Sequence, residues 1–214
     1  MASSVFFPVY SRVQNSGQEL RPVFTRVRRP VLLLAGWMIA GLAGGGTAAV
    51  RLLYDQRYDQ AGWIVQILAL ASWFTVLEST NGAVLLARGE SHWTAASSAA
   101  KLLGMLALIP LGYSLGGFPG AVAGLAVSEI FKYAVSAFAV ARAGLQGWPQ
   151  ELRLTSWVLA TAALGWSAAS FAERAGWSRY LVAALVFVAV TLAWAPLGLS
   201  FVSTYRAGSR AESR

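Results

Sequence analysis

The stretch LLGMLALIPLGYSLGGFPGAVAGLAVS (residues 102–128) runs for 27 residues without Asp, Glu, Lys or Arg and decides the fold class of this chain. A membrane-spanning helix needs about 20 mostly apolar residues. The turn sequence GGFPG at residues 116–120 interrupts the stretch, and a continuous helix would not contain it. We therefore interpret the stretch as parts of two membrane-spanning helices joined by a tight turn.

Four other stretches of 17 to 26 residues also lack charged side chains, and the second of them continues past Glu78 to Ala87. These stretches are residues 31–50, 61–77, 154–172 and 180–205. They are rich in Ala, Leu and Gly and lack the alternating pattern of barrel strands. The sequence therefore predicts an all-α, polytopic membrane helix bundle of about six spans, at residues 31–52, 62–86, 93–114, 119–141, 154–172 and 180–203.

The composition of the whole chain agrees with a membrane protein. Of the 214 residues, 57% are hydrophobic and 12% are charged, which is about half the usual charged share of a soluble domain. A soluble core of this size could not cover so much apolar surface. The chain has no cysteine, which excludes disulfides and thiolate chemistry. Polar residues and prolines within residues 1–30 argue against a cleavable signal peptide.

The distribution of arginines predicts the orientation, since cytoplasmic segments of membrane proteins carry an excess of Lys and Arg. If the N-terminus is cytoplasmic, the internal segments hold eleven arginines and the external segments hold four. The internal set is Arg12, Arg21, Arg26, Arg28, Arg29, Arg88, Arg142, Arg153, Arg206, Arg210 and Arg214, and the external set is Arg51, Arg57, Arg174 and Arg179. We expect both termini in the cytoplasm, and the net charge of +8 then requires no nucleic-acid partner.

Four charged residues fall inside the predicted spans, namely Glu78, Lys101, Glu129 and Lys132. A charge inside a bilayer costs several kcal/mol, so each one needs a partner or a water-filled path. At a rise of 1.5 Å per residue, all four lie roughly 12–20 Å from the cytoplasmic end of their span. They can therefore neutralise one another, and Glu129 and Lys132 can do so within one helix because they are three residues apart.

Small polar residues accompany these charges at helical spacing and form stripes on three consecutive helices. The stripes are Thr75, Glu78 and Asn81 or Gly82; Thr94, Ser97, Ser98 and Lys101; and Ser128, Glu129, Lys132 and Ser136. One interpretation is a hydrated interior surface, on which the four charges are candidate contacts for a substrate or a coupling ion. The alternative is that the polar residues fasten helices together, or that the lysines reach toward the membrane surface.

Residues suited to catalysis or metal binding are sparse. The single histidine, His92, cannot supply a multi-histidine metal site. Asp55 and Asp59 form a DxxxD pattern in the first external loop, and one helical turn would place both carboxylates on one side. Arg51 and Arg57 are close enough in sequence to pair with them instead. No nucleotide-binding, zinc-hydrolase or serine-hydrolase signature is present. We expect no cofactor, no metal and no enzymatic activity.

Four short motifs follow one another along the first two thirds of the chain, with a long apolar span between the first and the second. They are FFPVYSR at 6–12, YDQRYDQA at 54–61, LLARGE at 85–90 and GGFPGAVAG at 116–124. Their order and spacing resemble the C-terminal half of polysaccharide or oligosaccharide flippases, the O-antigen branch of the multidrug/oligosaccharidyl-lipid/polysaccharide (MOP) superfamily. The resemblance covers about residues 6–141 and rests mainly on turn glycines and prolines.

In that family, each motif marks a helix end on a particular side of the membrane. Phe7 and Pro8 match a Phe-Pro motif that closes a helix on the cytoplasmic side, and Tyr58 and Ala61 match an external Tyr-x-x-Ala element. Ala87 and Gly89 match a cytoplasmic Ala-x-Gly element, and Gly117, Gly120 and Ala121 match the G-x-x-G-A element that opens the next helix. These sides agree with the orientation that the arginines predict.

The resemblance implies a division of the chain and a partner. Residues 1–30 would be a basic cytoplasmic or interfacial segment that ends a preceding helix, and residues 31–141 would be four helices of the C-terminal flippase lobe. Residues 154–205 would be two additional helices, and residues 206–214 a cytoplasmic tail. The resemblance implies that the first lobe of such a carrier is missing from these residues, so the chain would be a fragment or a half-carrier. A second chain is one candidate source of the missing lobe.

The resemblance also implies a function. Such proteins move undecaprenyl-pyrophosphate-linked oligosaccharide across the bacterial inner membrane by alternating access, with the substrate path between two helical lobes. We expect contacts with membrane lipids and with a lipid-linked oligosaccharide in polysaccharide or lipopolysaccharide O-antigen biosynthesis. Two alternatives remain: a non-transporting scaffold of an envelope glycan complex, and a membrane enzyme acting on lipid-linked sugars through Asp55 and Asp59.

Overall fold

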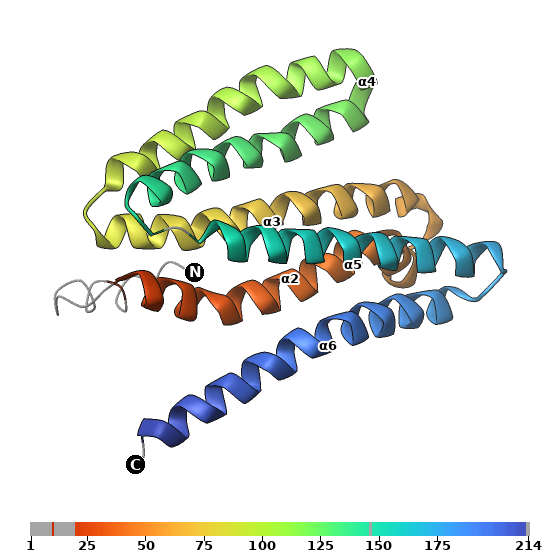
Figure 1. Ribbon diagram of the computed structural model, residues 1–214. Helices are drawn as coiled ribbons and strands as arrows, with labels where there is room; N and C mark the ends of the chain where they lie inside the picture. The colour runs from red at the N-terminus through yellow and green to blue at the C-terminus, as the bar shows by residue number, and fades with distance from the viewer. Residues whose placement is uncertain (1–9, 11–19, 146, 213–214) are drawn as a thin grey trace.

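The computed structural model describes residues 10, 20–145 and 147–212, and over these residues it contains long helices and no strand (Figure 1). The elements are α2 (Leu20–Leu53), the short 3-10 helix η1 (Gln56–Tyr58), α3 (Asp59–Ala87), α4 (Ser91–Arg142), α5 (Trp148–Arg174) and α6 (Arg179–Glu212). They overlap all six predicted spans, because α4 contains two of them. The prediction of an all-helical bundle is confirmed.

Four of the described helices are long and apolar enough to cross a membrane: α2, α3, α4 and α6. The structure is therefore that of a helical membrane protein. Helix α5 is not among the four, and its sequence contains three tryptophans and several serines and threonines among its apolar residues. It still packs against both α2 and α6.

Helix α4 is divided into two antiparallel arms by a break at Gly116 and Gly117 (Figure 1). Gly117 has φ 61° and ψ −146°, a backbone conformation that is essentially restricted to glycine. This break falls in the GGFPG sequence that predicted a turn. A straight helix of 52 residues would be about 78 Å long, more than twice the hydrocarbon thickness of a bilayer. The break therefore allows α4 to cross twice.

Glycines let the two arms of α4 touch through their backbones. A Cβ atom built on Gly120 would lie 1.9 Å from the carbonyl oxygen of Gly112, and one built on Gly124 would lie 2.2 Å from that of Leu108. Within a membrane, no hydrophobic driving force brings helices together. Small residues allow helices to approach closely, and the resulting van der Waals packing stabilises the contact. Gly120 also belongs to the GGFPGAVAG motif of the sequence, and in the structure it allows the close packing of the arms.

Helix α2 lies at the centre of the bundle and packs against α3, α5 and α6. Its three consecutive glycines each face a different neighbour. A Cβ on Gly44 would lie 2.8 Å from the Ala162 carbonyl oxygen of α5, and one on Gly45 would lie 2.8 Å from Val186 of α6. A Cβ on Gly46 would lie 2.8 Å from the side chain of Gln66 in α3. The glycine cluster therefore allows α2 to pack closely against three helices.

Tryptophan and threonine side chains hydrogen-bond between helices in the interior. The indole N–H of Trp73 in α3 donates to Thr155 Oγ1 of α5 at 2.8 Å, and that of Trp194 in α6 donates to Thr161 Oγ1 at 3.1 Å. Trp73 and Trp194 also belong to the main apolar core, together with residues from α2 and α5. These bonds allow large indole rings to be buried without an unpaired N–H.

The first described helix begins earlier than the apolar pattern predicts. Helix α2 starts at Leu20, within the segment expected to be a basic interfacial stretch, and continues through Pro30. Phe24, Arg28 and Leu32 are spaced by four residues and are all fully buried. This continuous buried stripe explains why the helix passes the proline, since neighbouring helices can compensate for the lost backbone hydrogen bond. Helix α6 likewise extends to Glu212, into the predicted tail.

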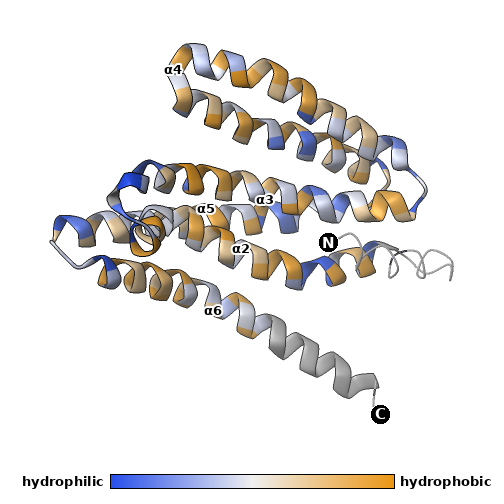
Figure 2. Ribbon diagram, turned by 180° about the vertical axis from the view of Figure 1, so that it is seen from behind, coloured by the Kyte–Doolittle hydropathy of each residue, from blue (hydrophilic) through white to orange (hydrophobic). Residues whose placement is uncertain are grey.

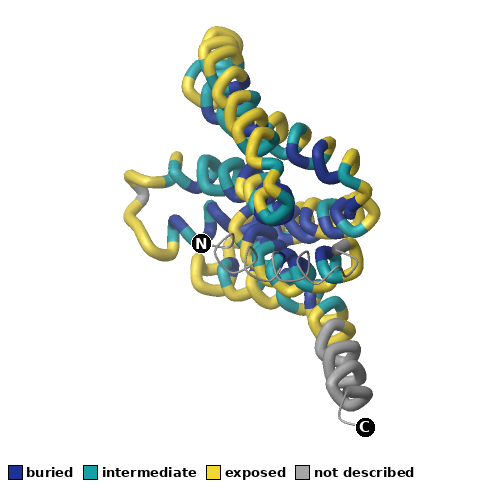
Figure 3. The backbone as a smooth tube through the Cα atoms, turned by 90° about the vertical axis from the view of Figure 1, so that its left-hand side faces the viewer, coloured by how far each residue is buried: buried dark blue, intermediate teal, exposed yellow. Residues whose placement is uncertain are grey.

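The two arms of α4 project from the rest of the bundle and pack mainly against α3 (Figure 3). Only 6% of the most apolar window of α4 is buried, compared with 50% for α2. Figure 2 shows that hydrophobic residues are spread around both arms. Large apolar side chains such as Leu106 and Leu115 are exposed. The arms therefore present an apolar surface that lipid or a further helical partner has to cover.

Candidate functional site

The four charges predicted inside the membrane meet between α3 and α4. Lys132 Nζ lies 3.0 Å from Glu78 Oε2, and Lys101 forms an ion pair with Glu129 across the two arms of α4. Ser97 Oγ, also in the first arm, lies 3.5 Å from Glu78 Oε1. We refer to Glu78, Lys101, Glu129 and Lys132 as the charged cluster. Its two positive and two negative charges balance, as the sequence led us to expect.

The pairing differs from the one that is possible within a single helix. Glu129 and Lys132 are three residues apart on the second arm, yet each pairs with a residue from another segment. Lys101 comes from the first arm and Glu78 from α3. Each ion pair therefore links two segments, so the cluster sets the position of both arms relative to α3.

The lysine side chains of the charged cluster are more exposed than its glutamate side chains. Side-chain exposure is 7% for Glu78 and 13% for Glu129, compared with 21% for Lys132 and 30% for Lys101. The net charge of the cluster is zero, and its more exposed part consists of lysine side chains.

A second polar cluster, which the sequence did not reveal, joins four helices beside the first. Arg28 Nη1 of α2 lies 2.7 Å from Glu151 Oε1 of α5 and donates to Asn81 Oδ1 of α3 at 3.3 Å. The Tyr133 hydroxyl of α4 donates to the other carboxylate oxygen of Glu151. The Arg28 guanidinium also lies over the ring of Phe24, 4.6 Å from its centroid. We call Arg28, Asn81, Tyr133 and Glu151 the arginine cluster.

The two clusters are continuous along the chain, because Asn81 follows Glu78 by one helical turn and Tyr133 follows Lys132 directly. Arg28 and Glu151 are both buried, with exposures of 0% and 3%. Arg28 belongs to a basic run and Glu151 lies in the first turn of α5 after Pro149, so both looked like surface charges in the sequence. Only a prediction that α2 continues past Pro30 could have indicated that the Arg28 side chain is buried.

Tyr10 packs beside this cluster, with its ring centroid 6.1 Å from that of Phe24. Burial raises the pKa of the Tyr10 phenol to about 12, although the nearby positive charge of Arg28 acts in the opposite direction. Tyr10 therefore stays neutral at physiological pH. The charge that compensates Arg28 is the Glu151 carboxylate.

At the opposite end of α2, Arg51 joins α2 to α3 and α5. Its guanidinium lies 3.3 Å from Asp59 Oδ1 and 3.0 Å from Glu173 Oε1. Of the two carboxylates in the DxxxD pattern, Asp59 therefore pairs with Arg51. The other, Asp55, lies in the loop between α2 and η1. Among the described residues, no group of three His, Cys, Asp or Glu side chains is arranged to hold a metal ion.

The motif residues lie at helix ends and close contacts. Tyr58 ends η1 and Ala61 lies in the first turn of α3, while Ala87 ends α3. Gly89 has φ 76° in the turn that leads to α4. Gly117 lies at the break in α4, followed by Gly120 at the contact between the arms and by Ala121. Phe7 and Pro8 lie outside the described residues.

Comparison with curated proteins finds one distant relative. The chain is 24% identical over 91 residues to the teichuronic acid biosynthesis protein TuaB of Bacillus subtilis (strain 168). The aligned region covers 42% of this chain and 19% of the relative, so the chain corresponds to a small part of that protein's length. No protein-family profile matches the chain. No solved structure matches it either.

The fold and this similarity together define the class of protein. The chain is a helical membrane protein with distant similarity to a protein of polysaccharide biosynthesis. The similarity supports a polysaccharide-related role in the membrane.

Proposed function

We propose that this chain forms part of a carrier that moves undecaprenyl-pyrophosphate-linked oligosaccharide across the bacterial inner membrane, without catalysing a chemical reaction. Three observations support the proposal. The relative is named for the biosynthesis of teichuronic acid. The motif residues shared with flippases lie at turns and tight contacts. The lysine side chains of the charged cluster are more exposed than its glutamate side chains.

The accessibility of the lysines is the observation that carries the proposal. A pyrophosphate is a compact polyanion, and ammonium groups bind such anions as point charges. Lys101 and Lys132 would attract the pyrophosphate or an acidic sugar, while Glu78 and Glu129 keep the empty site neutral. A neutral site also limits the cost of placing charges within the membrane.

We further propose that a second helical lobe, on another chain or another segment, packs against the open side of α4. The largely exposed apolar arms of α4 support this arrangement. The substrate path would then run between the lobes, along the face that holds the charged cluster. Both termini of the present chain would lie in the cytoplasm.

The runner-up function is a scaffold that assembles an envelope glycan complex. The observation that favours it is the complete pairing of the four charges, which is also what helix fasteners need. The two functions make different demands on the lysines. A scaffold needs only that no charge is left unpaired, whereas a carrier needs the positive charge itself.

Removal of one ion pair as a whole separates the two functions. In Lys101→Gln/Glu129→Gln, no charge is left without a partner, so we expect the chain to insert and fold. We nevertheless expect export of the lipid-linked oligosaccharide to fall at least about tenfold, the usual effect of losing one charged contact. Export would be measured in a flippase-deficient strain that also produces the second lobe.

The matched control is Arg174→Gln, which removes an exposed charge at the far end of α5. Its export should equal that of the unaltered chain. Normal export by Lys101→Gln/Glu129→Gln would contradict the carrier and support the scaffold. Absence of export with the unaltered chain, whether or not a second lobe is present, would contradict the proposal as a whole.

A further inference from the structure

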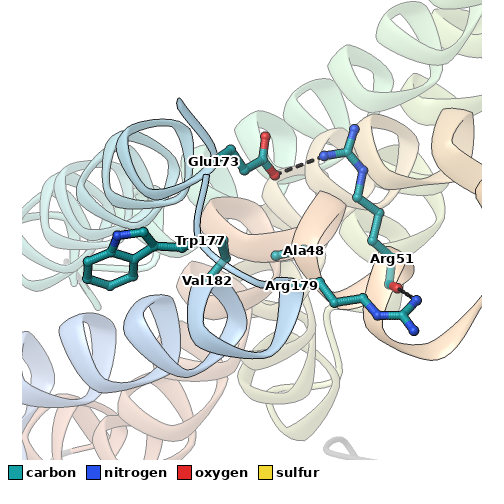
Figure 4. A pocket seen from close by; sticks show the side chains of 6 residues that line it. All are labelled: Ala48, Arg51, Glu173, Trp177, Arg179 and Val182. Carbon is teal, nitrogen blue, oxygen red and sulfur yellow. Dashed lines mark hydrogen bonds and ion pairs between the residues drawn. The ribbon is translucent and has the colours of Figure 1, made fainter. Parts of the chain in front are cut away.

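A polar pocket lies at the end of the bundle where α2 ends and α6 begins (Figure 4). Its volume is about 240 Å³, and its walls are Ala48, Arg51, Glu173, Trp177, Arg179 and Val182. The candidate membrane spans of α2 and α6 end and begin at Leu53 and Arg179. The pocket therefore lies at the level of the lipid headgroups, on the opposite end of α2 from Arg28.

The two arginines of this pocket have different surroundings. Two carboxylates, Asp59 and Glu173, hold the Arg51 guanidinium. Arg179 Nη1 donates to the backbone carbonyl of Arg51 at 3.3 Å, and within the described residues no carboxylate lies within ion-pair distance of Arg179. The pocket thus contains one cation that lacks an anionic partner, beside a carboxylate and an indole.

An apolar groove runs along α2 and α6 beside this pocket. Its volume is about 650 Å³, within the range of roughly 300–1,000 Å³ that is typical of small-molecule sites. Its walls include Met38 and Leu42 of α2 and Tyr180 and Phe187 of α6. The guanidinium of Arg179 lies over the ring of Tyr180, 5.3 Å from the centroid. Arg179 therefore lies where the polar pocket and the apolar groove adjoin.

We propose that the pocket and the groove together bind one phospholipid with a primary-amine headgroup, of the phosphatidylethanolamine type. Arg179 binds the phosphate and Glu173 binds the ammonium group. One acyl chain lies in the groove. The site is independent of the charged cluster, and the lipid is a structural component rather than the transported substrate.

The balance of charges favours a zwitterionic lipid over an anionic one. The pocket wall holds two positive charges, Arg51 and Arg179, and one negative charge, Glu173. Asp59, which pairs with Arg51 from outside the wall, brings the total charge to zero. An anionic headgroup has no ammonium group to pair with Glu173, so its negative charge and the Glu173 carboxylate would repel each other. A zwitterionic headgroup can place its phosphate toward Arg179 and its ammonium toward Glu173.

The proposal is tested by native mass spectrometry of the full chain in detergent, with phosphatidylethanolamine or phosphatidylglycerol added at equal concentration. We expect the first lipid to be retained at least about tenfold better than the second, which corresponds to one charge-assisted contact. Glu173→Gln should abolish this preference, because the ammonium group loses its partner. Arg179→Gln should lower the retention of phosphatidylethanolamine about tenfold, because the phosphate loses its partner. Arg179→Lys should retain phosphatidylethanolamine like the unaltered chain, because it keeps the positive charge.

The groove is tested by filling it. Gly41 lines the groove and has open space around its Cα, so Gly41→Trp should block the acyl chain and reduce retention of phosphatidylethanolamine about tenfold. Gly198→Trp is the matched control, since Gly198 has equally open space on α6 outside the groove. Equal retention of both lipids by the unaltered chain, or undiminished retention by Gly41→Trp, would overturn the proposal.

Discussion

Arg28→Met is expected to lower the free energy of unfolding by about 3–5 kcal/mol, because it leaves the Glu151 carboxylate charged, buried and without its partner. Arg28 is fully buried and holds Glu151 at 2.7 Å and Asn81 at 3.3 Å. Its removal would disconnect α2 from α3 and α5 at one end of the bundle. The measurement is equilibrium unfolding of the purified chain in mixed detergent micelles.

Two further variants separate this effect from a simple loss of packing. In Arg28→Met/Glu151→Leu, both charges are removed, and replacement of a buried ion pair by apolar residues is often neutral. We therefore expect the double variant to recover most of the lost stability. Arg26→Met changes an exposed arginine in the same turn of α2 and should have little effect. Equal, small losses for Arg28→Met and Arg26→Met would contradict the structural role of the arginine cluster.

Gly120→Val is expected to separate the two arms of α4 and to abolish function in any assay that depends on the charged cluster. A Cβ at this position would lie 1.9 Å from the Gly112 carbonyl oxygen, which is backbone and cannot rotate away. The arms would have to move apart by about 1 Å, and such overpacking costs about 1–3 kcal/mol or more. Unfolding in detergent micelles measures the loss of stability.

The loss of function in Gly120→Val follows from the ion pair between Lys101 and Glu129, which depends on the separation of the arms. Gly116→Val is the control, because a Cβ at Gly116 meets nothing within 4 Å and its φ is negative. It should leave stability and export nearly unchanged. A Gly120→Val chain as stable and active as Gly116→Val would show that the arms are not packed as described.

Much of the fold follows from local sequence patterns. The uncharged stretches located the six helical segments, and the GGFPG sequence located the break in α4. Both are local signals: the first reflects the cost of exposing polar groups to lipid, and the second reflects backbone freedom at Gly117. The start of α2 was missed because the predicted span was defined by the absence of charge, and Arg28 and Arg29 precede it. The buried stripe that extends the helix to Leu20 depends on neighbouring helices.

The candidate site could be predicted only in part. Intramembrane position alone identified Glu78, Lys101, Glu129 and Lys132, because isolated charges in lipid are costly. The ion-pair partner of each residue could not be assigned from the sequence. Glu129 and Lys132 are three residues apart, so they could equally have formed an ion pair within one helix. The Arg28–Glu151 ion pair had no signal of its own, because each residue lies next to other polar residues outside the apolar stretches.

The most direct test of the account is whether α4 crosses the membrane twice with its charges inside. The natural chain has no cysteine, so single cysteines can be introduced at exposed serines with little change in shape. Ser91 is the first residue of the first arm, Ser114 lies near the break, and Ser178 lies between α5 and α6. An impermeant maleimide applied to intact cells should label Ser114→Cys and Ser178→Cys but label Ser91→Cys only after lysis. Labelling of Ser91→Cys and Ser114→Cys from the same side would contradict the account.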